Sequence, residues 1–270
     1  MLRHLTFAIC LRHAARRIAC SLAILPFAML LAVSSAQAAD PLARQVLTAI
    51  CGRESPIHES SGEHQPSCRT CPAFTGFAGS HEDFVLEDIY QGHFTAPKAS
   101  EALAIFGGCE PHAAGFGGHA LFRREKDAWH LVFYASGFRA NGCLVYARSQ
   151  GTSLLVCQRS DMHAGAWEIW FSEAWLEGGE LKENSLFSVN GNDGTTPHAD
   201  RLSSVVSRDF RKSPDDPNLI LITLEETPPP SGQTRSHIVH LQFTGDHFQL
   251  APQDVKTVEQ LDQRSSGSGH

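Results

Sequence analysis

The sequence predicts an all-β protein, and three features of the chain support this. From Asp83 onward, short runs rich in β-branched and aromatic residues alternate with Gly, Pro, Asn and Asp. The spacing of apolar residues within this region recurs further along the chain. A helical pattern is convincing only over residues 40–50. Together these features indicate antiparallel sheets preceded by one short helix.

Residues 1–38 have the organisation of a secretory signal peptide. Residues 1–20 carry four arginines and no acidic residue, an apolar run follows over residues 21–33, and Ala36 and Ala38 provide the small residues that signal peptidase accepts. The apolar run is too short to span a bilayer stably. We therefore expect cleavage after Ala38 and a mature protein that is periplasmic or secreted.

The length and charge of the chain exclude several classes of protein. The chain has 270 residues and a formal net charge of −7, and removal of residues 1–38 leaves 232 residues with a net charge of −11. A chain this acidic lacks the basic surface that nucleic-acid binding requires. No second apolar run is long enough to span a membrane. We expect a globular protein with no nucleic-acid partner and no membrane span.

The cysteines predict a framework of disulfide bonds. Six remain after removal of the signal peptide, and an even number in an exported chain predicts up to three bonds. Cys143 and Cys157 each lie seven residues from Gln150 in a β-rich hairpin, so folding it there places them directly opposite each other. We predict a Cys143–Cys157 bond. The pairing of the other four is left open: Cys51, Cys68, Cys71 and Cys109.

Cys68 and Cys71 form a C-x-x-C motif that has three interpretations. A redox motif of this kind lies at the start of a helix, where the helix dipole lowers the pKa of the thiol, but no helical pattern follows here. A zinc site that adds Cys109 and His112 has suitable ligand types. Export favours oxidation, so we expect structural cysteines bonded to Cys51 and Cys109.

The chain divides into four segments. The signal peptide at residues 1–38 is followed by a short helix and a cysteine-containing loop at 39–82, a β-repeat domain at 83–252 and a flexible tail at 253–270. The helix over residues 40–50 is predicted by a capping aspartate, a proline at the first helical position and apolar residues spaced along one face.

Within the β-repeat domain, six apolar residues recur at an interval of 116 residues, and a shorter version of the unit lies between the two copies. The units begin near residues 83, 140 and 200, and each predicts a meander of about four strands. The matched pairs are Leu86 and Leu202, Ile89 and Val205, Tyr90 and Val206, Phe94 and Phe210, Leu103 and Leu219, and Ile105 and Leu221.

Each unit resembles a degenerate blade of the FG-GAP or VCBS type of β-propeller. The resemblance rests on a strand with an aromatic residue at its end (Phe94, Phe210), a polar turn and an apolar return strand, over residues 83–252. It implies blade-like sheets and a scaffold for surface recognition. Three units are fewer than a closed propeller needs, which leaves a homo-oligomer open. An ordinary β-sandwich is the alternative fold.

We expect no cofactor. Blades of this type usually carry an Asp-rich calcium loop, but the only turn with acidic residues at alternate positions, near Asp209 and Asp215, lacks the glycine of such a loop. Zinc or copper is the alternative, because the mature chain has 13 histidines and imidazole is a common metal ligand. The candidate metal ligands are His58 and His64 in one polar loop, and His112 and His119 around a glycine-rich loop.

The first functional interpretation is a binding or interaction module without catalysis, for a protein or glycan partner. Nucleophile elbows, zinc-protease motifs and phosphate-binding loops are absent from the sequence. A metal-binding protein or enzyme that uses the histidine loops is the second interpretation. The third is carbohydrate binding, or glycoside hydrolysis by Glu168 or Glu173, around the tryptophans of one predicted strand: Trp167, Trp170 and Trp175.

Overall fold

The structure is a computed structural model, and the residues it describes belong to one compact unit within residues 39–270. The signal peptide predicted at residues 1–38 lies outside them. No helix among the described residues is long and apolar enough to cross a membrane. The described ranges are 41–51, 57–59, 65–77, 83–109, 117–140, 142–163, 166–192, 201–230 and 232–266.

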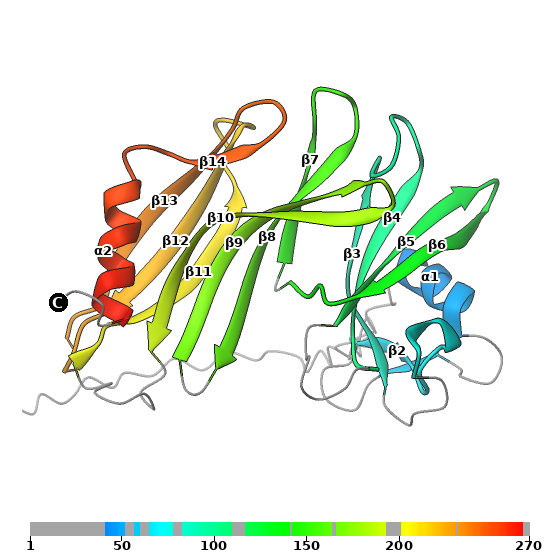
Figure 1. Cartoon of the computed structure of the whole chain (residues 1–270), viewed down its shortest axis with the longest axis horizontal. Helices are drawn as coiled ribbons and strands as arrows, with labels where there is room; N and C mark the ends of the chain where they lie inside the picture. Colours follow the sequence, from blue (N-terminus) through cyan, green and yellow to red (C-terminus); the bar gives the residue numbers. More distant parts are fainter. Residues whose placement is uncertain are drawn as a thin grey trace, which may run out of the picture. The chain divides into compact units, whose positions relative to one another are not determined.

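The protein is all-β, as predicted, with three antiparallel sheets in which every strand pairs with its neighbour in sequence (Figure 1). Sheet A has six strands and sheets B and C have four each. Sheet A contains β1 (Ile57–Glu59), β2 (Pro66–Cys68), β3 (Phe84–Gly92), β4 (Glu101–Gly107), β5 (Gly118–Glu125) and β6 (Ala128–Ser136). Sheet B contains β7 (Gly142–Ala147), β8 (Ser153–His163), β9 (Ala166–Glu177) and β10 (Glu180–Asn192). Sheet C contains β11 (Ser204–Lys212), β12 (Leu219–Thr227), β13 (Arg235–Phe243) and β14 (Phe248–Leu250).

Three meanders therefore begin close to the predicted positions, at β3, β7 and β11. The segment before residue 83 is less irregular than expected, since β1 and β2 extend sheet A. The recurring apolar spacing runs over β3 and β4 of sheet A and over β11 and β12 of sheet C, with Leu202 just before β11, but its aromatic residues differ in place. Phe94 follows the end of β3, whereas Phe210 lies within β11, because that strand stays paired as far as Lys212.

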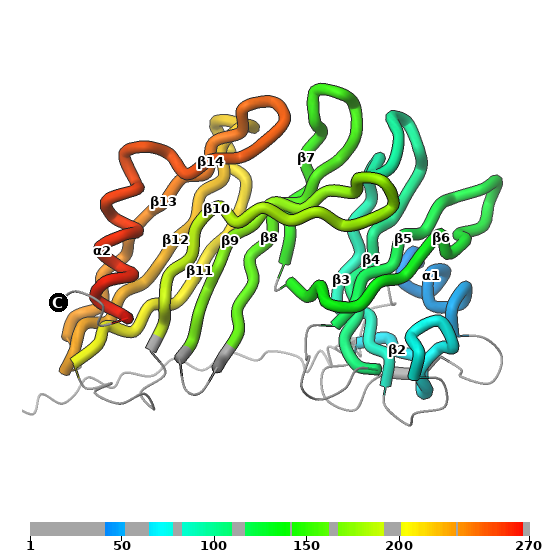
Figure 2. The backbone as a smooth tube through the Cα atoms, viewed as in Figure 1, coloured from blue at the N-terminus to red at the C-terminus, as the bar shows by residue number. Residues whose placement is uncertain are grey.

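The sheets pack face to face with sheet B in the middle, as the ribbon and the tube both show (Figures 1 and 2). One core cluster joins sheets A and B through residues such as Ile105 and Leu155. A second joins sheets B and C through residues such as Phe171 and Ile222. Strand β4 is buried along its whole length because both faces of sheet A are covered, whereas burial alternates along β12 of the outer sheet C.

The N-terminal helix is confirmed as α1 (Pro41–Cys51) and covers the outer face of sheet A. Its apolar stripe, including Val46, Leu47 and Ile50, packs into the core cluster on that face. Cys51 at its last turn is bonded to Cys68 of β2. The short 3-10 helix η1 (Ala73–Thr75) packs near β6 on the same side of the sheet.

The prediction of a flexible tail at residues 253–270 is wrong for most of this segment, because α2 (Val255–Ser266) forms there. Val258 and Leu261 are buried in the core between sheets B and C, and Arg264 donates two hydrogen bonds to the buried carboxylate of Glu226. The helix has only these two apolar residues in its interior, and so narrow a stripe gives a weak helical signal in the sequence.

Candidate functional site

A polar depression among the described residues lies on sheet B, on the face directed toward sheet A. It has a volume of about 420 Å³ and is open to solvent. Three adjacent strands, β8, β9 and β10, supply its lining. The lining residues are Arg159, Glu168, Trp170, Glu183, Ser185 and Ser188.

Strand geometry explains why these side chains meet. Arg159 of β8 is directly opposite Trp170 of β9, and Trp170 is directly opposite Ser188 of β10. Opposed residues project to the same face of a sheet, as do residues two apart along a strand, so Glu168 joins this group. The site is therefore a row of side chains across three strands of one rigid sheet.

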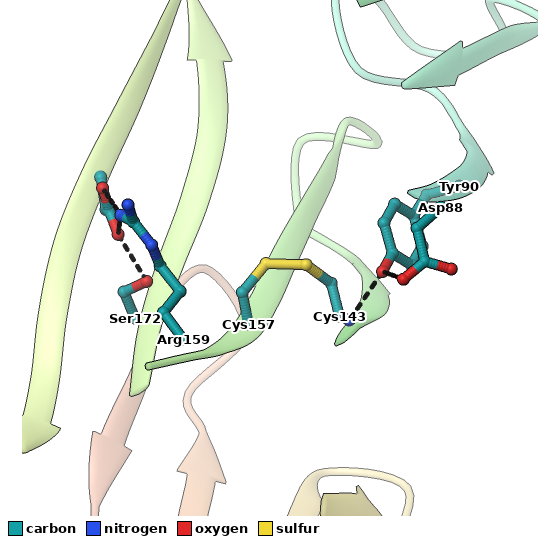
Figure 3. Close-up of a disulfide and its surroundings, with 7 residues drawn as sticks. Asp88, Tyr90, Cys143, Cys157, Arg159 and Ser172 are labelled. Carbon is teal, nitrogen blue, oxygen red and sulfur yellow. Dashed lines mark hydrogen bonds and ion pairs between the residues drawn. A yellow bond between two sulfur atoms is a disulfide. The ribbon is translucent and has the colours of Figure 1, made fainter. Parts of the chain in front are cut away.

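Arg159 is held in place from three sides. Its guanidinium carbon lies 5.1 Å from the ring centroid of Phe138 and 5.2 Å from that of Trp170, so the cation contacts two aromatic rings. Its Nη1 donates to both carboxylate oxygens of Glu183, at 2.7 Å each. The Oγ of Ser172 donates to the same carboxylate at 2.7 Å (Figure 3). These contacts fix the guanidinium and orient the rim of the depression.

The charged groups of the site differ in their exposure. The side chain of Arg159 is 10% exposed and that of Glu183 is 33% exposed. Glu168 is exposed, and Trp170 is half-buried. The Nε of Arg159 is buried without a hydrogen-bond partner, which is costly for a charged donor. The guanidinium thus lies at the floor of the depression. The carboxylates and the indole are the groups that a ligand can reach first.

The predicted Cys143–Cys157 disulfide is present beside this site, and the register pairs these two residues directly. Cys157 lies two residues before Arg159 on the same face of β8 (Figure 3). The bond ties the edge strand β7 to β8. The hydroxyl of Tyr90 accepts a hydrogen bond from the Cys143 amide and donates one to Asp88, and thereby links β7 to sheet A. Burial, followed by the charge of Asp88, raises the pKa of Tyr90.

The structure does not bring the three predicted tryptophans onto one surface. Trp170 lines the depression, whereas Trp167 and Trp175 occupy odd positions of β9 and pack into the core toward sheet C. Glu173, one of the two predicted carboxylates, is on that same opposite face and is completely buried. It accepts hydrogen bonds from Asn184, His247 and the Phe248 amide. Glu173 therefore stabilises the contact between sheets B and C and is not available to a substrate.

Of the four candidate histidine ligands, the structure describes the side chain of one. His64 and His112 lie outside the described residues, and of His58 only the backbone in β1 is described. His119 of β5 is 4% exposed, and neither ring nitrogen has a hydrogen-bond partner. The rings of Phe133 and Phe138 lie nearly perpendicular to the imidazole, each with 5.8 Å between ring centroids. Burial lowers the pKa of His119 to about 4.

The disulfide pairing is incompatible with both the predicted zinc site and a redox pair formed by Cys68 and Cys71. Cys68 is bonded to Cys51, and Cys71 is bonded to Cys109, so all three proposed thiolate ligands are oxidised. The structural interpretation, with partners at Cys51 and Cys109, is the one that the structure shows. Within the described parts of the chain, no three His, Cys, Asp or Glu residues converge in a way that could hold a metal ion.

A second depression, of about 460 Å³, lies between α1 and the β5–β6 turn and is lined by Arg44, Asp127 and Trp129 among others. Trp129 is buried in the core beneath it, at 8% exposure. Its remaining polar groups come from one helix face and one turn, and no buried polar side chain is directed into it among the described residues. It is a weaker candidate than the site on sheet B.

Sequence reasoning missed Arg159 and Glu183, which organise the site. The sequence contained part of the information. Once residues 166–177 are taken as a strand, the alternation of side chains places Trp170 on the opposite face from Trp167 and Trp175. The pairing of β8 with β9 and β10 could not be read from spacing alone. No protein-family model matches this chain, and neither the curated proteins nor the solved structures contain a match.

Proposed function

We propose that this protein is an exported binding module whose ligand is a carbohydrate, held on the depression of sheet B at Trp170. The three disulfides indicate an oxidising environment, periplasmic or extracellular. The signal peptide at residues 1–38 belongs to this proposal, as does the interpretation of the three meanders as propeller-like repeats that act as a scaffold.

The arrangement around Trp170 is the observation that carries the proposal. Sugars present both apolar C–H faces and hydroxyl groups, so a site for them combines an aromatic surface with fixed hydrogen-bonding groups. Here a half-buried indole lies beside the acceptors Glu168 and Glu183 and the hydroxyls of Ser185 and Ser188. The lining comes from paired strands, which hold these groups at fixed separations.

A binding role fits this lining better than hydrolysis. Glycoside hydrolysis requires two carboxyl groups on either side of one bond. Glu173 faces the opposite core, and Glu183 is engaged by Arg159 and Ser172. This leaves Glu168 as the exposed carboxylate next to the indole, which suits hydrogen bonding to a bound sugar.

Glycan-array binding of the oxidised protein tests the proposal through Trp170→Ala. Loss of the indole removes the stacking surface, and we expect affinity to fall by about tenfold or more, since a ring contact of this kind contributes roughly 1–2 kcal/mol. Trp175→Ala is the matched control, because Trp175 is on the same strand but faces the opposite core. If that variant is unstable, Trp175→Phe keeps a ring in place. Full binding by Trp170→Ala, or absence of any glycan ligand, would contradict the proposal.

A further inference from the structure

Arg159, at the floor of the proposed site, has a hydrogen-bond donor that the protein leaves unused. Its side chain is 10% exposed and lines the depression, and its Nε is buried without a hydrogen-bond partner. Both bonds to Glu183 are made by a different nitrogen, Nη1. The guanidinium is planar and holds its donors in a fixed fork, so these bonds leave the Nε–H on another edge of the group. A buried charged donor without a partner is costly, and an acceptor supplied by a ligand would remove that cost.

The floor and the rim of the depression offer opposite kinds of hydrogen-bonding group. A guanidinium can only donate, whereas the exposed carboxylate of Glu168 can only accept. Arg159 is directly opposite Trp170, and Glu168 lies two residues before Trp170 on the same face of β9. Such diagonal positions on paired strands are about 7–8 Å apart, so one small group can contact both side chains beside the indole.

We propose that the carbohydrate bound at this site is an N-acetylated amino sugar. Its acetamido carbonyl accepts a hydrogen bond from Arg159, its amide N–H donates to Glu168, and its ring contacts Trp170. This inference rests on the proposed function and names its ligand class. An amide has an acceptor and a donor on opposite edges, which matches the donor at the floor and the acceptor at the rim. The Nε is covered in the free protein, so binding requires the guanidinium to turn this edge toward the carbonyl.

Other sugar substituents match these two groups less well. A hydroxyl group at the floor would bring its own proton to a buried cation and would need a further acceptor there. A protonated amino group has no acceptor for the Arg159 donor and carries a charge of the same sign. A carboxylate would satisfy this donor but would be repelled by Glu168 and by the excess negative charge of the chain. The acetamido group is therefore the substituent expected to bind most tightly.

Titration of the intact, oxidised protein with four oligosaccharides of equal length tests this expectation. The oligomers are those of N-acetylglucosamine, glucosamine, glucose and galacturonic acid. We expect the N-acetylglucosamine oligomer to bind about tenfold more tightly than the glucose oligomer, because hydrogen bonds to charged groups are stronger than those between neutral groups. This preference should change little as salt is added, since neither oligomer carries a net charge.

Arg159→Lys tests the donor, because lysine keeps a positive charge beside Glu183 but has no nitrogen at the position of Nε. We expect the preference for the N-acetylglucosamine oligomer over the glucose oligomer to fall from about tenfold to about twofold or less. Arg148→Lys is the matched control and should retain the full preference. The Arg148 guanidinium also lies over a tryptophan, Trp175, and its Nε is also buried without a partner, but that tryptophan packs toward sheet C.

The Nε–H resonance of Arg159 provides a second measurement, by NMR of the native protein with isotope-labelled arginine. The rings of Phe138 and Trp170 lie about the guanidinium, so through-space contacts to them assign the resonance without a variant. We expect the N-acetylglucosamine oligomer to shift this resonance and the glucose oligomer to leave it nearly unchanged. The corresponding resonance of Arg148 should respond to neither.

The outcomes separate this inference from the proposed function. Equal binding of the N-acetylglucosamine and glucose oligomers by the native protein overturns the inference and leaves carbohydrate binding intact. Tightest binding of the glucosamine or the galacturonic acid oligomer also overturns it. An Arg159 resonance that does not respond to the N-acetylglucosamine oligomer, or an unchanged preference in Arg159→Lys, has the same consequence. Absence of binding to every glycan overturns both.

Discussion

His119 shows how a single buried residue makes stability depend on pH. Its imidazole contacts the rings of Phe133 and Phe138 in the core that joins sheets A and B, and neither of its nitrogens has a hydrogen-bond partner. Desolvation disfavours the charged form, so the pKa is about 4 in the folded protein compared with about 6.5 in an unfolded chain. Between these values the unfolded chain binds a proton that the folded protein does not.

We therefore expect His119 to reduce the free energy of unfolding as pH falls from about 6.5 to about 4, by about 3 kcal/mol in total. Replacement by an apolar residue, His119→Leu, removes the titrating group and should flatten this part of the pH profile. Denaturant unfolding of both proteins across the window, referenced to neutral pH, provides the measurement. A slope that is the same in both proteins would show that other groups cause the acid sensitivity.

Residue position within a strand also decides the roles of the tryptophans. Trp170 reaches solvent, and Trp175 contacts the guanidinium of Arg148 and the ring of His247 inside the B–C contact. The two residues are five positions apart, an odd number, so a straight strand sends them to opposite faces. Composition alone groups them together, whereas the period of the strand separates them.

At the scale of elements, α2 is the part of the fold that the sequence pattern predicts least. Burial alone would raise the pKa of Glu226, but hydrogen bonds from Arg264, Ser203 and His237 outweigh it and lower this pKa. The helix therefore contributes a cation to a buried carboxylate as well as two apolar side chains. Its contacts come from β10, β11 and β13, and β10, the strand against which it packs most, ends 63 residues before the helix begins.

Leu261→Ala tests whether α2 is an integral part of the core. Leu261 is fully buried between sheets B and C, so we expect the substitution to lower the free energy of unfolding by about 2–5 kcal/mol. Val255→Ala in the first turn of the same helix is the control. Val255 is 40% exposed, and its loss should change stability by only about 0.5 kcal/mol. Equal effects in the two variants would indicate that α2 does not dock in solution as described.

At the scale of the whole molecule, short polar contacts connect the meanders in sequence order. The Ser153 amide donates to the His93 carbonyl and the His93 amide donates to the Ser153 hydroxyl, so the β3–β4 loop is joined to the start of β8. Ser149 in the β7–β8 turn bonds to Gly245 and Asp246 in the β13–β14 turn. Hydrogen bonds from the β7–β8 hairpin of sheet B therefore reach both neighbouring sheets. They add to the two hydrophobic core clusters, one between sheets A and B and one between sheets B and C.

The disulfides should differ in what their removal costs. Cys71–Cys109 closes a separation of 38 residues and Cys143–Cys157 one of 14. By chain entropy alone, replacing both cysteines with alanine should cost about 4 kcal/mol for the longer loop and about 3 kcal/mol for the shorter. Denaturant unfolding of the two double variants measures this. A larger loss at Cys143–Cys157 would mean that this bond acts mainly through the folded state, by holding β7 beside the proposed site.

The sequence by itself determined the fold class, the position of α1, the three meanders and the register of the Cys143–Cys157 hairpin. These depend on local periodicity and turn residues, which act between residues close in the chain. Tertiary structure decided the rest. It buried His119, docked the weakly patterned α2, paired four cysteines and placed Arg159, Trp170 and Glu183 across three strands. Those contacts depend on which sheet covers which face, and a side chain meets such a partner only after the sheets have packed.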